Sequence, residues 1–280
     1  MNDFARTYRR DCLLGALGAA LMLVGDLCLS VIPASAGDSG LFLRAAYFDG
    51  AFQPWRLPLL VGTGLLGMAL GFFSVRAVCA SVLPQCRRTR LALRIGGAIY
   101  LTSAGAVHLL IGSLADWTGT LAPLLGREET AALVQAQYER VMPSMLLAYA
   151  GMVLMILTSA WAVLTKRTVL PRRLFIFHML TWQLVLMLIP DVRQLLGAPV
   201  STWDFVLSQG SGNAALLIWI LANAVWAPRG KAAANMTNWQ EETKDDRKGF
   251  IGGPRPWRAA GAGLRRRHPE RRGRYGASVP

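Results

Sequence analysis

Histidine and cysteine are scarce in this chain of 280 residues, which contains three of the first and four of the second. The cysteines form no CxxC pair, and their spacing with the histidines matches no metal site. The nucleophile pattern GxSxG is also missing. We therefore predict no metal and no cofactor, and we expect the cysteines to act as small apolar residues: Cys12, Cys28, Cys79 and Cys86.

Acidic residues are also few, 16 against 30 basic ones, which gives a net charge of +14. From Arg229 onward the chain has 13 basic and 5 acidic residues, so this segment carries most of the excess. It is rich in Gly, Pro and Arg and too poor in apolar residues to build a core. We predict a disordered cytoplasmic tail over 229–280 that attracts anionic lipid headgroups, and no nucleic-acid partner.

Apolar residues make up 53% of the chain and gather in long runs. A helix needs about 20 such residues to cross a hydrocarbon core roughly 30 Å thick. The pattern predicts an all-α polytopic membrane protein whose transmembrane domain, 1–228, contains six helices. The expected spans are 12–32, 57–75, 95–114, 143–164, 171–190 and 208–227.

The distribution of Lys and Arg predicts the orientation of these spans. Basic residues gather in the amino-terminal flank and in the second-to-third and fourth-to-fifth connections. Short cytoplasmic connections carry such an excess, so both termini should be cytoplasmic. Trp55, Trp117 and Trp203 lie beside predicted outer ends, where an aromatic belt is expected.

A secretory signal peptide is the alternative interpretation of the first span. Arg9 and Arg10 precede an apolar stretch that ends near a small-residue site, Ala34-Ser35-Ala36. The stretch is longer than the usual 7 to 15 residues, and it contains Asp26. Cleavage would leave five spans and remove Asp26, and mass measurement of the amino terminus distinguishes the two cases.

Three apolar runs contain a polar residue at a similar depth. A carboxylate at the centre of a bilayer costs about 2.5 to 3.5 kcal/mol, so Asp26 should face other helices. Helix rise places Asp26 and His108 about 10 Å below the outer edge and Asn213 about 8 Å below it. Asp26 and His108 also share helix faces with small residues that permit close packing. With Asp191 at the outer end of the fifth span, these residues predict a ligand or proton site in an outer polar cavity.

Each of these residues also has a structural interpretation. His108 could donate to a backbone carbonyl in a packed interior, and Asn213 could form an ordinary helix–helix hydrogen bond. Asp191 follows Pro190 and could be a solvated interfacial residue. His178 has no partner at metal-ligand spacing and is interpreted as an interfacial residue, and the segment 127–141 is interpreted as a short outer amphipathic helix.

The order of several short motifs resembles a family of bacterial six-helix membrane proteins of unknown function. The resemblance covers residues 10–228, with departures at Val107 and Arg173, and the basic tail has no counterpart. It implies a bacterial inner-membrane location and the same polar positions, but no activity. The motifs are Gly25-Asp26-Leu27, Trp55-Arg56-Leu57, the glycines from Gly62 to Gly71, Gly105-Ala106-Val107-His108, Thr168-Val169-Leu170-Pro171-Arg172-Arg173, Pro190 and Gly212-Asn213-Ala214.

Three functions are compatible with these features. The first is the binding or transfer of a small molecule or proton by Asp26 and His108, since intramembrane ionisable groups commonly mark such pathways. The second is an enzyme acting on a lipid or periplasmic substrate, with His108 as general base oriented by Asp26 or Asp191. The third is a structural or assembly component whose polar residues only fix helix packing.

Overall fold

The computed structural model describes residues 3–38 and 43–226, and its regular structure within these ranges is helical, without strands. This confirms the predicted all-α class. The predicted tail, 229–280, lies outside the described residues. The helices are α1 (Asp3–Ser30), α2 (Ala45–Phe48), α3 (Arg56–Ser81), α4 (Arg87–Leu125), α5 (Arg127–Leu164), the 3-10 helix η1 (Arg172–Phe177), α6 (Met179–Leu195) and α7 (Thr202–Val225).

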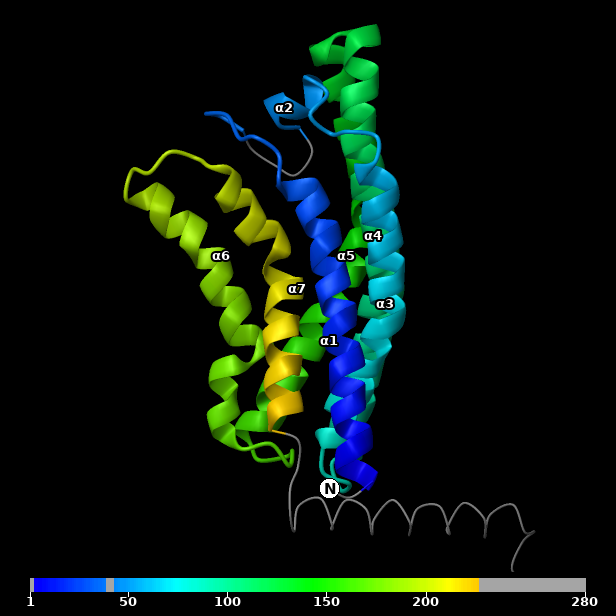
Figure 1. The fold of residues 1–280 in the computed structure, drawn as a ribbon, viewed down its shortest axis with the longest axis vertical. Helices are drawn as coiled ribbons and strands as arrows, with labels where there is room; N and C mark the ends of the chain where they lie inside the picture. The colour runs from blue at the N-terminus through cyan, green and yellow to red at the C-terminus, as the bar shows by residue number, and fades with distance from the viewer. Residues whose placement is uncertain (1–2, 39–42, 227–280) are drawn as a thin grey trace, which may run out of the picture. The chain divides into compact units, whose positions relative to one another are not determined.

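Six segments of the described chain are long and apolar enough to cross a membrane, with η1 and α6 counted as one. Each predicted span overlaps one of them, and 12–32, 171–190 and 208–227 extend one or two residues past the ends of theirs. The start of α1 and the end of α7 lie at the same end of the bundle (Figure 1), as six successive crossings require. That this end is cytoplasmic stays a prediction.

Helices α4 and α5 are much longer than the spans expected in them. They contain 39 and 38 residues, and 39 residues at 1.5 Å each extend about 58 Å, well beyond a hydrocarbon core. The segment 127–141 is therefore the first part of α5 and not a separate helix. Helix α5 extends past the apolar region through the charged residues of this segment. Pro143 lies inside the helix and does not end it. The two helices extend past the others in Figure 1.

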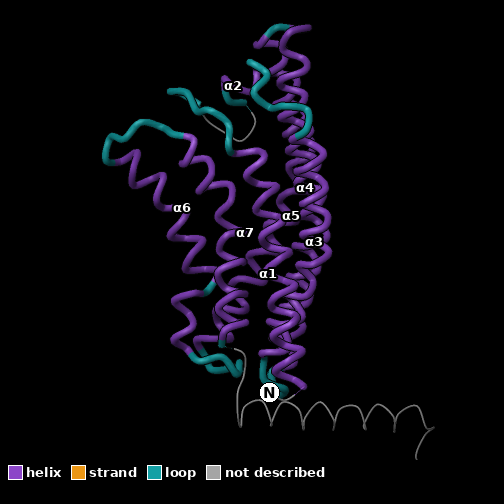
Figure 2. The backbone as a smooth tube through the Cα atoms, in the orientation of Figure 1, coloured by secondary structure: helices purple, strands orange, loops and turns teal. Residues whose placement is uncertain are grey.

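The helices pack in an order that differs from their order in the chain. Helix α1 lies between α3 and α7, α4 lies between α3 and α5, and α6 contacts mainly α7. The loops lie near the two ends of the bundle, and α6 stands at its edge (Figures 1 and 2). Helices α5 and α7 therefore face each other across a space that α1 and α4 border.

Glycine permits the closest of these contacts. A Cβ atom on Gly18 would lie 2.6 Å from the backbone nitrogen of Gly71, and one on Gly67 would lie 2.7 Å from the carbonyl oxygen of Gly18. Real Cβ atoms do not approach other atoms so closely, so any side chain here would force α1 and α3 apart. The close packing predicted for the helix that contains Asp26 is confirmed in α1, where Cβ atoms on Gly15 and Gly18 would lie 2.6 Å from atoms of α3.

Two arginines fix the carboxyl-terminal end of α1. The Arg44 side chain is fully buried and donates to the carbonyl oxygens of Leu29, Ser30 and Ile32. Arg56 Nη1 donates to the carbonyl oxygen of Cys28 over 2.7 Å. The last carbonyl groups of a helix have no partner within the helix, so these guanidinium groups satisfy them. The position of Asp26, one turn before this end, is thereby fixed.

Candidate functional site

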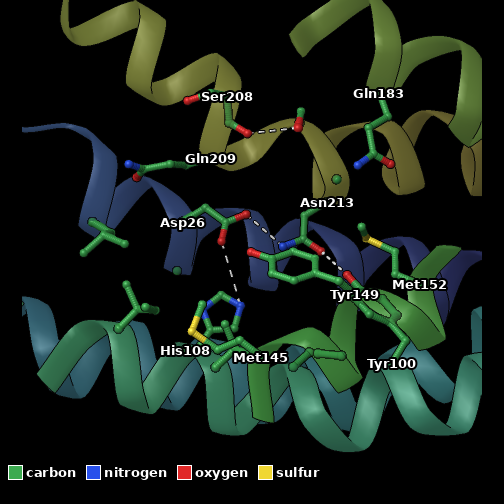
Figure 3. A pocket seen from close by; sticks show the side chains of 18 of the residues that line it. Asp26, Tyr100, His108, Met145, Tyr149, Met152, Gln183, Ser208, Gln209 and Asn213 are labelled. Atoms are coloured by element: carbon green, nitrogen blue, oxygen red, sulfur yellow. Dashed lines mark hydrogen bonds and ion pairs between the residues drawn. The ribbon is translucent and has the colours of Figure 1, made fainter. Parts of the chain in front are cut away.

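A cavity of about 430 Å³ lies between α1, α4, α5, α6 and α7, with Leu60 of α3 at its border. This volume is within the range of small-molecule sites. Most of its lining is apolar, but every bordering helix except α3 contributes at least one polar side chain (Figure 3). These side chains are Asp26, Tyr100, His108, Tyr149, Gln183, Ser208, Gln209, Ser211 and Asn213.

Asn213 links three helices at the centre of this polar group. Its Nδ2 donates to Asp26 Oδ2 over 2.8 Å, and its Oδ1 accepts from the Tyr100 hydroxyl over 3.2 Å. A carboxylate can only accept, so the amide nitrogen must face Asp26 and the amide oxygen must face Tyr100. The network therefore connects α1, α7 and α4 in one arrangement.

His108 occupies a slot between two glycines. A Cβ atom on Gly25 would lie 3.1 Å from His108 Nδ1, and one on Gly64 would lie 2.9 Å from His108 Cγ. The ring fits because α1 and α3 have no side chain at these positions. Its Nε2 lies 3.8 Å from Asp26 Oδ1, which is too long for a hydrogen bond. The side chains of His108 and Asp26 are only 10% and 15% exposed.

Two glutamines that line the cavity have polar atoms without partners. Gln183 Oε1 and both side-chain polar atoms of Gln209 are buried and make no hydrogen bond with any described residue. The two side chains come from α6 and α7 and border the same cavity as Asp26 (Figure 3). A buried polar atom without a partner costs about 1–3 kcal/mol. These amides therefore indicate a hydrogen-bonding partner that the described protein does not itself supply.

Among the described residues, the cavity is lined by one acidic residue and by no lysine or arginine. The acidic residue is Asp26. The nearby Arg44 and Arg56 bind carbonyl groups at the end of α1. Asp26 therefore has no arginine or lysine partner.

Three of the four predicted site residues, Asp26, His108 and Asn213, come together in this cavity. Asp191 does not line it; its side chain is exposed on α6. Sequence reasoning missed Tyr100, Tyr149 and Gln183 as lining residues. The two tyrosines could have been noticed as polar groups in apolar runs, whereas nothing in the sequence indicates which side of α6 faces the other helices.

His178 differs from its sequence interpretation as an interfacial residue. Its side chain is fully buried, its Nδ1 accepts from the backbone nitrogen of Leu180, and its Nε2 lies 3.0 Å from Ser159 Oγ. The ring also packs on Trp219, 4.6 Å between centroids. With Nδ1 accepting, Nε2 must be the protonated nitrogen, so this histidine joins η1, α5 and α7 as a structural group.

The fold and the cavity define a class of protein. Its described part is helical, six of its helices are long and apolar enough to cross a membrane, and polar side chains line a cavity between these helices. Within residues 3–38 and 43–226, no three His, Cys, Asp or Glu side chains gather as a metal site requires. The chain belongs to DUF6796, a family of unknown function that residues 1–205 match. The predicted membership of a family of unknown function is confirmed.

The family match includes part of the site. Asp26, Tyr100, His108 and Gln183 lie within residues 1–205, whereas Asn213 lies beyond them. No curated protein and no solved structure matches the chain. The functional argument therefore depends on the geometry of the cavity.

Proposed function

We propose that this protein crosses a membrane six times and binds a small, partly apolar molecule in the cavity, with Asp26, His108 and Asn213 at its polar end. The observation that carries the proposal is the set of buried polar atoms that face the cavity without partners. Binding of a polar group there would supply the hydrogen bonds that the protein itself leaves unmade.

The exposed surface supports the membrane location. The span formed by η1 and α6 is the least covered of the six candidate spans, and only 17% of its most apolar stretch is buried. Large apolar side chains are exposed along it, a surface that lipid chains would cover. A bacterial inner membrane, cytoplasmic termini and contact of the basic tail with anionic headgroups are further parts of this proposal. The exposed side chains include Leu184, Val185, Leu188, Ile189 and Val192.

An enzyme is less well supported by the same geometry. Ser208 and Ser211 are the lining residues whose hydroxyl groups could serve as a nucleophile. Each donates to a carbonyl oxygen of its own helix: Ser208 to that of Phe205, and Ser211 to that of Ser208. Neither is hydrogen-bonded to His108. A general base needs its proton donor within hydrogen-bond reach or one water away, so these serines are not prepared for catalysis.

Proton exchange would accompany binding if the ligand changed the charge of the pair formed by Asp26 and His108. The other titratable groups that face this pair are Tyr100 from α4 and Tyr149 from α5. The described lining residues of α3, α6 and α7 are not titratable. Binding that changes with pH between 5 and 8 in the original protein, but not in Asp26→Asn, would indicate such exchange.

The test of binding is to fill the cavity from a position away from Asp26. Gly212 lines the cavity, and a Cβ atom there would meet only Met152 Sδ, at 3.8 Å. Gly212→Phe can therefore place a ring in the cavity without a backbone clash. Gly62→Phe is the matched control, because a Cβ atom at Gly62 meets nothing within 4 Å and this residue does not line the cavity.

The measurement is native mass spectrometry of the full chain, extracted from its own membranes in a mild detergent. We expect a bound small molecule on the original protein and on Gly62→Phe, and its loss from Gly212→Phe. An equal mass addition on all three proteins would place the molecule outside the cavity. A protein that carries nothing in any form would contradict the proposal.

A further inference from the structure

We propose that the ligand is a lipophilic molecule with a single protonated amine, whose ammonium group binds Asp26 and whose apolar part lies among Met145, Met152 and Met187. This inference rests on the proposed function, because it names the class of molecule that the same cavity takes. It goes further in assigning the sign of the ligand's charge and the residue that recognises it.

The first argument is the unused capacity of the carboxylate. An ionised carboxylate can accept about four hydrogen bonds, and Asp26 accepts one from a side chain, through Oδ2 from Asn213. Its Oδ1 faces the cavity and lies beyond hydrogen-bond distance from His108 Nε2. A donor placed between this oxygen and the open volume would complete the site.

The second argument is the cost of a buried anion. A carboxylate in a nonpolar environment is unfavourable unless a cation pairs with it. The two nearby arginines bind the end of α1, and His108 is held at 3.8 Å by its glycine slot. A ligand cation supplies the missing charge, whereas an anionic ligand would add a second negative group to a site that already has one.

The third argument is the character of the surrounding side chains. The rings of Tyr100 and Tyr149 lie beside the pair formed by Asp26 and Asn213 (Figure 3), and aromatic faces attract ammonium groups. The amides of Gln183 and Gln209 offer further hydrogen bonds to a polar head. The methionines provide a flexible apolar lining that adapts to a hydrocarbon chain or ring.

The net charge of the protein makes this preference easy to distinguish from adsorption. At +14 the whole chain attracts anions and repels cations. Nonspecific electrostatic binding would therefore favour a carboxylate over an amine. A preference for the amine must come from a local negative site.

The experiment compares three probes with one hydrocarbon part and different heads: 4-phenylbutan-1-amine, 4-phenylbutan-1-ol and 4-phenylbutanoate. Binding to the full chain in zwitterionic phosphatidylcholine nanodiscs at pH 7 is measured by calorimetry, and the heat from protein-free discs is subtracted. Hydrogen bonds to charged groups are stronger than neutral ones, so we expect the amine to bind about tenfold more tightly than the alcohol. The carboxylate should bind most weakly.

The variants locate the preference. Asp26→Asn should abolish the advantage of the amine and leave alcohol binding in place. Asp116→Asn is the matched control, since it removes a carboxylate from α4 that does not line the cavity, and it should keep the advantage. The comparison of amine with alcohol on the original protein needs no variant, so a folding defect in Asp26→Asn would not prevent the test.

Three negative outcomes have different meanings. If amine and alcohol bind equally and Gly212→Phe abolishes both, the cavity binds small molecules but the charge assignment is overturned. The assignment also fails if Asp26→Asn keeps the full advantage of the amine. If no probe shows binding that Gly212→Phe abolishes, the proposed function and this inference both fall.

Discussion

The glycine slot around His108 makes a prediction that opposes the usual effect of glycine replacement. In a helix interior, Gly→Ala stabilises by about 0.5–1 kcal/mol, because glycine loses more backbone freedom on folding. At Gly25 the added methyl group would lie 3.1 Å and 3.2 Å from His108 Nδ1 and Cε1. The ring cannot easily retreat, since Gly64 on α3 also lies against it.

The expected magnitude follows from the balance of these two effects. Forcing an extra methyl group into a packed interior costs about 1–3 kcal/mol. Gly25→Ala should therefore reduce the free energy of unfolding by about 0.5–2 kcal/mol after the gain in helix propensity. In the His108→Ala background the ring atoms are gone, and the same substitution should become stabilising by about 0.5–1 kcal/mol. The Leu60 carbonyl oxygen, 3.3 Å from the new methyl, is present in both backgrounds.

The assay is reversible unfolding of the purified protein by titration of a denaturing detergent in mixed micelles. A double-mutant cycle over Gly25→Ala and His108→Ala gives the coupling free energy, which we expect to be about 1–3 kcal/mol. Gly62→Ala serves as the reference for propensity alone, because nothing lies within 4 Å of its Cβ position.

A Gly25→Ala protein that gains as much stability as Gly62→Ala would refute the slot. The same conclusion would follow if the loss at Gly25 were unchanged after removal of the imidazole. Either result would mean that His108 is not held against α1. The glycine slot would then not explain why His108 Nε2 lies 3.8 Å from Asp26 Oδ1.

Further predictions concern the network, the helix end and the orientation. Asn213→Leu should lower the free energy of unfolding by about 1–3 kcal/mol, because Asp26 and Tyr100 lose their partner; detergent titration measures the loss, and an unchanged value would contradict the network. Arg44→Met should cost about 3 kcal/mol or more in the same assay, whereas Arg127→Met, on an exposed ion pair, should cost less than about 1 kcal/mol. A cysteine in place of the exposed Glu128, in a chain whose native cysteines are serines, should react with an impermeant thiol reagent on intact cells; reaction only in inside-out vesicles would reverse the orientation.

The number of membrane-length helices and the presence of close glycine contacts between them could be predicted from the sequence, because both depend on local patterns. Runs of about 20 apolar residues specify the spans, and small residues at helical spacing specify close contacts. The ends of the spans were less predictable. The charges from Arg127 to Arg140 indicate where the apolar run begins, but a helix can continue beyond that point, as α5 does.

The candidate site was predictable in depth but not in composition. Helix rise alone places Asp26, His108 and Asn213 at one level, and the structure brings them together. Which way each helix is rotated depends on its neighbours, so the same reasoning included Asp191, which lies exposed on α6. Rotation also decides that Gln183 borders the cavity, and no local pattern indicates it.

The central claim is that a ligand with a polar head completes the site at Asp26. The most direct measurement is an experimental structure, at a resolution that shows waters, of the full chain purified from its own membranes. We expect density in the cavity for a molecule larger than water, with a polar atom within about 3 Å of Asp26 Oδ1. A cavity filled by waters alone, or closed by contact of His108 with Asp26 and of Gln209 with the rest of the network, would contradict it.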